Sequence, residues 1–543
     1  MPSFNLIDED WVPCVLADGS SKLLGLRDAL TNSHDIKEIS DSSPLVVVAI
    51  LRLMLAILHG NFGPENMSRW LALWQAGKWD AAELAAYFET WRHRFDLFDQ
   101  DRPFYQSREL RGAERHPVLH LATEVSSGNN PTLFDHSSDD SPPAVTPDVA
   151  ARYVLATQAY SIGGGVSTPF NLSDSPLTRG VSVFAVGDNL FQTLALNLIE
   201  YNESLPLERS GPDVPIWEND YPEEPYSAGT PTKGYLDYLT WQSRNIHLFP
   251  EGDPVGVRYC QIQQRLKLPK QQYLDPFKCF QRGEKGLVPK ALSADRAVWR
   301  DSHALLQKAD SDFKRPEVFN WLARVDDRRR AGQIDARPEY QVVVAGLATA
   351  PGKAASVLLW RHERLPLPLK YLEDERLIAT LEEALHLAEG VGRLLGAGCV
   401  QVQGKTKRFQ VPSPMWLLAQ EVLAKDQNGK ADSNAVRSFV ASLSPTRSYW
   451  ASLGISFNHL VTELPADTSP DGEYGASVLL RWAREVGRAA RQAFRQATDS
   501  LDHSGRWLKA VSIAQDSFKR LLNSTINEFT APYQQETEER GGE

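Results

Sequence analysis

The segment 476–498 has the sequence ASVLLRWAREVGRAARQAFRQAT, and its periodicity predicts a long amphipathic helix. Its apolar residues recur on one side of that helix, namely Leu479, Trp482, Val486, Ala490, Ala493 and Ala497. Its arginines fall within roughly one quarter of the circumference, and they are Arg481, Arg484, Arg488, Arg491 and Arg495. We therefore expect the apolar side to pack against other helices and the arginines to face outward.

Similar helical patterns surround this segment and define the C-terminal third of the chain. They run, joined by polar linkers, over Glu373–Leu395, Pro412–Lys425, Tyr449–Glu463 and Gly505–Ile526. Consecutive helices of this kind predict an antiparallel, four-helix bundle over residues 369–533. Residues 534–543 are polar and acidic, and we expect them to form a frayed tail.

Residues 1–368 have a mixed pattern, which predicts a large α/β domain with irregular loops. Alternation from Phe4 to Leu16 predicts a β-hairpin, and the apolar run Leu45–Leu58 predicts a buried helix. Two β-branched segments, Tyr340–Leu347 and Ala355–Leu359, predict a second hairpin with a seven-residue tip. The fold class expected for the whole chain is therefore α+β.

Length, charge and cysteine content limit the classes of protein. A chain of 543 residues is too long for a single hydrophobic core, so we expect two or three units. The net charge of −11 repels nucleic acids and acidic membranes at long range, so any contact with DNA must be local or supported by partners. The four cysteines are widely spaced and no leader precedes them, which predicts a cytoplasmic protein. The longest apolar run is too short to cross a bilayer, so we expect no membrane association.

The sequence carries no motif for catalysis or for metal binding. It lacks the Gly-x-Ser-x-Gly elbow and the His-Glu-x-x-His pattern. His116 and His120 have a spacing of four, but Pro117 between them argues against a helix that would direct both rings at one metal ion. We therefore expect no catalytic residues, no metal site and no cofactor, and predict that the protein is not an enzyme.

A run of three glycines, Gly163, Gly164 and Gly165, separates a helical pattern from an extended stretch, Val166–Phe170. Glycine has no Cβ, so its backbone can come close to a phosphate, a base edge or a groove wall. The P-loop and dinucleotide-binding spacings are absent. A flexible connector and an enzyme that binds a nucleotide or phosphate through this loop both remain alternatives.

Two basic patterns are candidates for contact with an anionic partner. Arg265 and Lys267 alternate with leucines, which on an extended segment places both side chains on one side, while Lys270 follows closely. The arginines of segment 476–498 repel one another, so a polyanion or an acidic protein surface would stabilise them. In each case the alternative is a solvated surface.

These features occur in an order that resembles the CasA family, the large subunits of the type I-E CRISPR surveillance complexes called Cascade. The resembling segments are Leu6-Ile7-Asp8 with Trp11-Val12-Pro13, Arg102–Gln106, the glycine run with Thr168-Pro169, Arg179-Gly180, Leu239–Gln242, and Ala355-Ser356 through Trp360–Glu363. The resemblance covers most of the chain.

The resemblance implies a non-catalytic subunit of an RNA-guided CRISPR interference complex. Such a subunit recognises the protospacer-adjacent motif in double-stranded DNA and promotes strand opening and R-loop formation. It also docks a separate helicase-nuclease. The implied partners are double-stranded target DNA, guide RNA with other Cascade subunits, and that nuclease, and the isolated chain is expected to be monomeric.

The resemblance also implies roles for particular residues. Gly163, Gly164 and Gly165 would approach the minor groove of the motif, and Lys267 or Lys270 would contact the same duplex. The hairpin tip Gly352, Lys353 and Ala354 would form a wedge beneath the motif. The family's best-known member has glutamine where Ala354 stands, so Lys353 or the backbone would have to fill the separated base step.

A further loop would contact guide RNA and neighbouring subunits, through Asn129, Asn130, Thr132, Leu133 and Phe134. Our own inference concerns the arginines of segment 476–498. We expect them to border the path of the opened DNA or of a small helical subunit.

Overall fold

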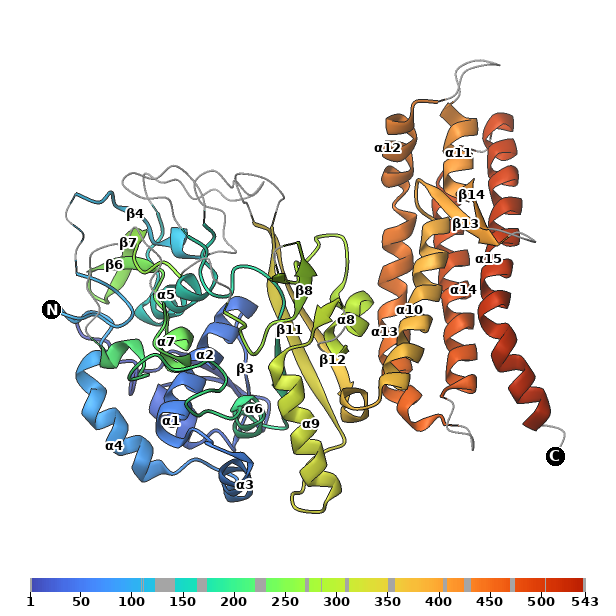
Figure 1. The fold of residues 1–543 in the computed structure, drawn as a ribbon. Coiled ribbons are helices and arrows are strands. Elements are labelled where there is room, and N and C mark those ends of the chain that lie inside the picture. The colour runs from blue at the N-terminus through green and yellow to red at the C-terminus, as the bar shows by residue number, and fades with distance from the viewer. Residues whose placement is uncertain are drawn as a thin grey trace. The chain divides into compact units, whose positions relative to one another are not determined.

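The structure is a computed structural model in two compact units, Met1–Leu365 and Pro366–Glu543, which are called unit 1 and unit 2 (Figure 1). It describes residues 2–108, 110, 112–122, 142–163, 173–219, 231–268, 273–284, 286–307, 312–349, 357–403, 408–423, 431–468, 474–502 and 504–540.

The central helix of unit 1 is α2 (Pro44–Phe62), where the sequence predicts a buried helix. Its apolar residues surround the whole circumference, which is typical of a helix buried on all sides. By length and composition it could cross a membrane, but 83% of the qualifying window is buried inside the protein. Arg52, within this helix, donates hydrogen bonds to the Asp275 carboxylate (3.3 Å) and the Tyr238 carbonyl (2.9 Å). A charged residue is therefore compatible with this core position.

Further helices of unit 1 pack around α2. They are α4 (Ala81–Trp91), α5 (Pro147–Tyr160), α6 (Leu190–Asn197) and α7 (Tyr235–Leu239). The remaining helices of the unit are α1 (Leu26–Thr31), α3 (Met67–Ala76), α8 (Ser302–Leu306) and α9 (Glu317–Arg330).

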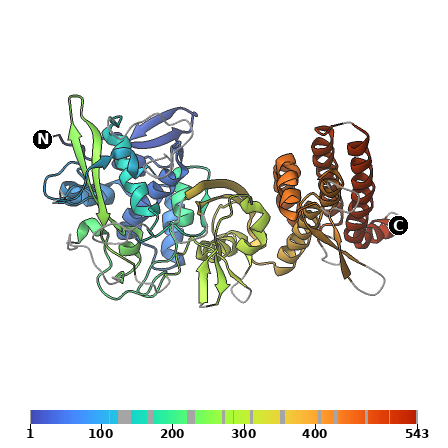
Figure 2. The same ribbon diagram turned by 90° about the horizontal axis from the view of Figure 1, so that it is seen from above.

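Small antiparallel sheets complete unit 1. The predicted N-terminal hairpin is present as β1 (Val12–Leu16) and β2 (Ser21–Leu24), with β3 (Ile36–Ile39) on the other side of β1. A second sheet has β7 (Gly256–Gln264) between β6 (Arg244–Glu251) and the short β4 (His116–Pro117). Figure 2 shows the β6–β7 hairpin in light green, beside α5.

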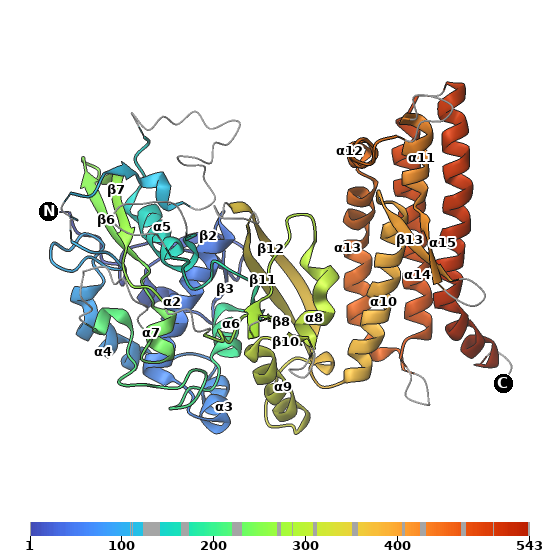
Figure 3. The ribbon, with the colours of Figure 1, turned by 45° about the horizontal axis from the view of Figure 1, so that its top comes forward.

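The second predicted hairpin is also present. Its strands are β11 (Glu339–Thr349) and β12 (Val357–Pro368), and β5 (Ser182–Val186) lies on the other side of β11. The tip, with Gly352, Lys353 and Ala354, lies outside the described residues. Figure 3 shows the long strands of the hairpin in yellow. A further sheet consists of β8 (Phe280–Gly283), β9 (Gly286–Pro289) and β10 (Phe313–Lys314).

Unit 2 is a helical bundle and the α+β fold class is confirmed, but its described residues form six α-helices where a four-helix bundle was expected. Its helices are α10 (Glu375–Leu394), α11 (Pro414–Leu423), α12 (Ser433–Leu443), α13 (Pro445–Glu463), α14 (Ala476–Asp499) and α15 (Gly505–Arg540). The helix α14 packs against α10, α13 and α15, and α15 also packs along α11 (Figures 1 and 3).

Two elements of unit 2 were not predicted. The first is helix α12, which ends where Ser444 has a positive φ of 49° and Pro445 begins α13. Proline lacks an amide N–H and is tolerated at the first helical turn, so α12 and α13 are separate helices. The second is a hairpin of β13 (Cys399–Gln403) and β14 (Arg408–Pro412). In addition, α15 continues to Arg540, into the segment 534–543 that was expected to be frayed.

Candidate nucleic-acid interface

We call the chain from Gly163 to Ser173 the glycine segment. One guanidinium, that of Arg244, binds at both of its ends. Gly164 and Gly165 lie outside the described residues, while Gly163 and Ser173 flank the gap. Nη2 of Arg244, at the start of β6, donates to the carbonyls of Ile162 (3.1 Å) and Ser173 (2.7 Å). Burial lowers the pKa of Arg244 to about 10. A buried cation is expensive unless hydrogen-bonded, and these carbonyls supply the required acceptors.

Gln264, the last residue of β7, holds the same loop end from another direction. Its Oε1 accepts hydrogen bonds from the Ser173 backbone N–H (2.6 Å) and hydroxyl (3.2 Å). Its Nε2 donates to the carbonyls of Ser243 and Leu266, both at 3.1 Å. The glycine segment is therefore connected to the chain that leads directly to Lys267.

An ion pair connects the glycine segment to the predicted wedge hairpin. The Gly163 N–H donates to Oδ1 of Asp174 (2.7 Å), and Nε of Arg179 donates to Oδ2 of the same carboxylate (2.8 Å). Nη1 of Arg179 donates to Oγ1 of Thr349 (2.7 Å), the last residue of β11. The pair is 39% and 36% exposed, so its contribution to stability is small, about 0–1 kcal/mol. Its effect is to connect the start of the glycine segment to the end of strand β11. We call the four residues Gly163, Asp174, Arg179 and Thr349 the loop junction.

The basic segment after β7 differs from the expectation in one respect. Arg265 and Lys267 were expected to face one side together. Arg265 is instead buried and donates to the side-chain oxygen of Gln242, whereas Lys267 is half-buried. Packing inside unit 1 overrides the local alternation. Lys270 lies outside the described residues, whereas Lys267 follows three positions after Gln264, whose side chain holds Ser173.

The predicted guide-RNA loop, with Asn129, Asn130, Thr132, Leu133 and Phe134, also lies outside the described residues. Its flanks are anchored, because the Leu121 carbonyl accepts from Thr157 Oγ1 in α5 (2.8 Å). On the other side the Pro142 carbonyl accepts from Arg258 Nη1 in β7 (2.5 Å). Strand β7 thus holds a flank of this loop through Arg258 and an end of the glycine segment through Gln264, and α5 ends at Tyr160, shortly before Gly163.

The arginines of α14 lie on its exposed face, as predicted. Two of them have acidic partners: Arg481 pairs with Glu463 of α13, and Arg488 pairs with Glu485 (2.6 Å). Glu485 lies three residues before Arg488 on the same helix, whereas Glu463 comes from a different helix and has no signal in the local sequence. Arg484, Arg491 and Arg495 are exposed on the same face.

The structure also locates the histidines considered as metal ligands. The rings of His116 and His120 stack 5.2 Å apart. Within the described ranges, no three His, Cys, Asp or Glu side chains gather closely enough to hold a metal ion. Cys14, Cys260 and Cys279 are buried thiols and Cys399 is exposed, and all four are free.

The residues that hold the candidate interface together were not predicted from the sequence. Arg244 and Gln264 act on Ser173 across 71 and 91 residues of chain, respectively. No local pattern signals such partners. Asp174 offered a weak signal, since Ser173-Asp174-Ser175 has the composition of a turn.

Comparison with known proteins identifies the class to which this two-unit fold belongs. The solved structure of CasA from Thermus thermophilus matches at a TM-score of 0.76 and 26% identity, covering 96% of this chain and 100% of that chain. Cse1 from Acidimicrobium ferrooxidans shares the fold at a TM-score of 0.76 and 24% identity, over 98% of this chain and 99% of its own. So does a chain of a solved CRISPR RNA-guided surveillance complex, at a TM-score of 0.72 and 21% identity, covering 95% of this chain and 100% of that chain.

Sequence comparison gives the family itself. The model of the CRISPR-associated protein Cse1 family matches residues 5–493. A curated CasA/Cse1 protein of Thermus thermophilus is 31% identical over 96% of this chain and 98% of its own length. The chain belongs to the CRISPR-associated Cse1 family, also called CasA, and the resemblance drawn from its sequence is confirmed.

Proposed function

We propose that this chain is the motif-reading subunit of an RNA-guided CRISPR surveillance complex in the cytoplasm. It recognises the protospacer-adjacent motif in double-stranded DNA, promotes strand opening and R-loop formation, and docks a separate helicase-nuclease that performs the cleavage. Its other partners are guide RNA and the remaining subunits of the complex. Base pairing with the guide then reads the rest of the target.

The observation that supports this proposal is the loop junction. Gly163, Asp174, Arg179 and Thr349 form a continuous chain of hydrogen bonds from the base of the glycine segment to the base of the wedge hairpin. A groove reader and a strand-separating wedge have to act on adjacent base pairs. Hydrogen bonds between the start of the glycine segment and the end of β11 set the distance between the groove reader and the wedge before DNA binds.

The physical roles follow from the shape of the duplex. The minor groove of B-DNA is about 6 Å wide, so backbone without side chains can approach its floor where larger residues are excluded. Lys267 contributes a local positive charge near the same place, within a chain whose net charge is −11. The hairpin tip around Lys353 enters beneath the motif and unstacks the next base step. No group on this chain is assigned a catalytic role.

Motif-dependent binding tests the proposal. The complex is reconstituted with guide RNA, and its affinity is measured for targets that differ only in the adjacent trinucleotide. We expect a clear preference for one set of trinucleotides, and we expect Gly164→Val to remove it by blocking approach to the groove. Gly211→Val is the matched control, because a Cβ at Gly211 meets no atom within 4 Å.

Two outcomes would contradict the proposal. If targets with all trinucleotides bind alike, the chain is a scaffold and not a reader. If Gly164→Val and Gly211→Val behave alike while the wild type discriminates, the reading is done elsewhere. Turnover of a nucleotide by the isolated chain would favour the alternative of an enzyme.

A further inference from the structure

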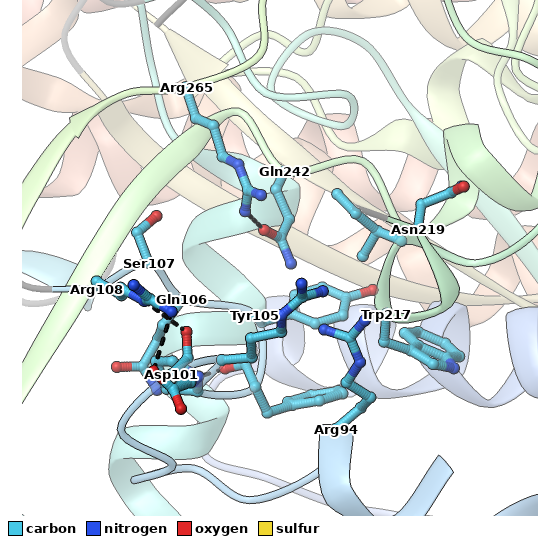
Figure 4. Close-up of a pocket in the computed structure, with 14 residues that line it drawn as sticks. Arg94, Asp101, Tyr105, Gln106, Ser107, Arg108, Trp217, Asn219, Gln242 and Arg265 are labelled. Carbon is cyan, nitrogen blue, oxygen red and sulfur yellow. Dashed lines mark hydrogen bonds and ion pairs between the residues drawn. The ribbon is translucent and has the colours of Figure 1, made fainter. Parts of the chain in front are cut away.

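A pocket in unit 1 lies beside the interface described above and has no role in the proposed function so far. Its volume of about 170 Å³ is enough for several water molecules. Figure 4 shows Tyr105, Trp217 and Arg94 on its lower side, with Arg265 and Gln242 above them. Two segments that carry the family resemblance, Arg102–Gln106 and Leu239–Gln242, contribute to its lining.

The pocket concentrates positive charge. Its lining contains the arginines Arg94, Arg102, Arg108 and Arg265 and a single acidic residue, Asp101. Asp101 is engaged by Arg108, with Nη2 to Oδ1 at 2.9 Å. Burial lowers the pKa of Arg94, because desolvation disfavours the charged guanidinium. An anion in the pocket would offset both the mutual repulsion and the desolvation, since guanidinium groups match the oxygens of carboxylates and phosphates.

The pocket is also pre-formed. Tyr105 has a φ of +57°, a left-handed conformation that is unfavourable for an aromatic residue and tends to occur at functional sites. The neighbouring Gln106 fixes this backbone, with Nε2 donating to the Leu97 carbonyl (2.8 Å). From α5, Gln158 Nε2 donates to the Tyr105 carbonyl (3.2 Å). At the pocket wall, Nδ2 of Asn219 is a buried donor without a hydrogen-bond partner in the described part of the chain.

We propose that this pocket binds a phosphodiester group of a nucleic-acid strand. Arg94, Arg102 and the Asn219 amide contact its oxygens, and Arg265 completes the positive wall. The inference rests on the proposed function and adds an anchoring point to it. The strand is either the guide RNA or the target DNA, which present the same phosphodiester chemistry.

Continuity with the loop bases favours a nucleic acid over an acidic peptide. The Arg265 backbone N–H donates to the Ser243 carbonyl (2.9 Å), and that carbonyl also accepts from Gln264 (3.1 Å), the residue that holds Ser173. Lys267 follows two positions later in the chain. A nucleic-acid strand that contacts Lys267 and the glycine segment therefore passes beside the pocket.

The test uses the reconstituted complex and the double variant Arg94→Gln with Arg102→Gln. Arg102→Gln alone is a second variant, because Arg102 is exposed and its loss does not threaten folding. The matched control is Arg69→Gln with Lys78→Gln, which removes the same charge from exposed sites outside the pocket. Two affinities are measured at several salt concentrations. The first is that of this subunit for the complex of guide RNA with the other subunits, and the second is that of the complete complex for target DNA.

We expect one of these affinities to fall about tenfold in the variant, the loss that accompanies one charge-assisted hydrogen bond. The slope of the logarithm of that binding constant against the logarithm of the salt concentration should become shallower by about 0.7–0.9 for each lost phosphate contact. A weaker assembly step identifies guide RNA as the source. Normal assembly followed by weaker target binding identifies target DNA.

The inference is overturned if the variants match the control at both steps. If assembly weakens, a single-stranded RNA of the guide sequence is titrated against the full isolated chain. Equal binding by wild type and variant would mean that an acidic protein segment occupies the pocket, which also overturns the inference. The proposed function is judged separately, by the motif preference of the wild-type complex and of the Gly164→Val variant, which do not depend on the pocket arginines.

Discussion

Arg244 and Asp174 are the residues through which the candidate interface is held together. Each is bonded to backbone at the base of the glycine segment, and Asp174 extends the connection to the hairpin through Arg179. The sequence alone singles out the glycines, because a run without Cβ atoms is visible locally. It does not reveal the residues that orient them, because their partners are distant in the chain.

The loop junction yields a prediction at this scale. Asp174→Ala should reduce the preference for the accepted motif several-fold, because Gly163 loses its acceptor and Arg179 its partner. The stability of unit 1 should change by less than about 1 kcal/mol, since the ion pair is partly exposed. Competition binding between targets with right and wrong motifs measures the first effect, and urea unfolding measures the second.

Glu251→Ala is the control for this prediction. Glu251 pairs with Arg258 at 2.8 Å, with side-chain exposures of 49% and 37%, so a comparable ion pair is lost. That pair is at the opposite end of the β6–β7 hairpin from Gln264. Equal motif preference in the two variants would show that the junction does not position the reader.

Among the elements, α14 agrees closely with its sequence and α12 does not. The apolar and arginine faces of α14 are both long, so its boundaries and orientation follow from periodicity. The helix α12 has only 11 residues and is separated from α13 by Ser444 alone, so its apolar pattern is too short to be recognised as a separate helix. The β13–β14 hairpin likewise depends on pairing between two strands of five residues each.

The arginine face of α14 supports a prediction at the scale of an element. Replacing Arg484, Arg488 and Arg491 together by glutamine should weaken target binding by the assembled complex and reduce its salt dependence, because several favourable charges are lost. The bundle should remain folded, since all three side chains are exposed. Affinity measured over a range of salt concentrations tests this.

The matched control changes Lys509, Lys519 and Arg520 of α15 to glutamine, which are exposed in the same unit. It removes the same charge from a different face of unit 2. If both triple variants bind alike, only the net charge matters and the α14 face has no specific partner.

For the whole molecule, the sequence predicts the order of an α/β unit and a helical bundle, and it gives the family. Both follow from features that extend over hundreds of residues, such as the change from mixed to helical periodicity. The sheet arrangement of unit 1 was not predicted, because pairings such as β11 with β5 join residues 155 to 163 positions apart, from Gln341–Val186 to Ala345–Ser182. Such pairings depend on tertiary packing and not on local propensity.

The core around α2 predicts how the stability of unit 1 depends on pH. His59 is buried with both ring nitrogens lacking a hydrogen-bond partner in the described chain, and burial lowers its pKa to about 3. The unfolded chain binds a proton near pH 6.5 while the folded chain does not, so stability falls as the pH drops from 6.5 towards 3. Between pH 7 and pH 5 the loss due to His59 should be about 2 kcal/mol.

The variant His59→Leu should lose this part of the pH dependence, and it should be no less stable at pH 7. Hydrogen exchange of α2 amides measures the unfolding of unit 1 at each pH. The exposed His93→Leu serves as the control and should keep the wild-type slope. An unchanged slope in His59→Leu would mean that this histidine is not kept neutral by the core.

The central claim is that the backbone at the glycine segment reads the duplex. A cryo-EM map of the assembled complex on a target with the accepted motif tests this most directly. We predict that the chain between Gly163 and Ser173 lies in the minor groove of the motif, with Lys267 at the phosphates and the β11–β12 tip beneath the adjoining base pair. A map in which that chain faces solvent, away from the DNA, would contradict the account.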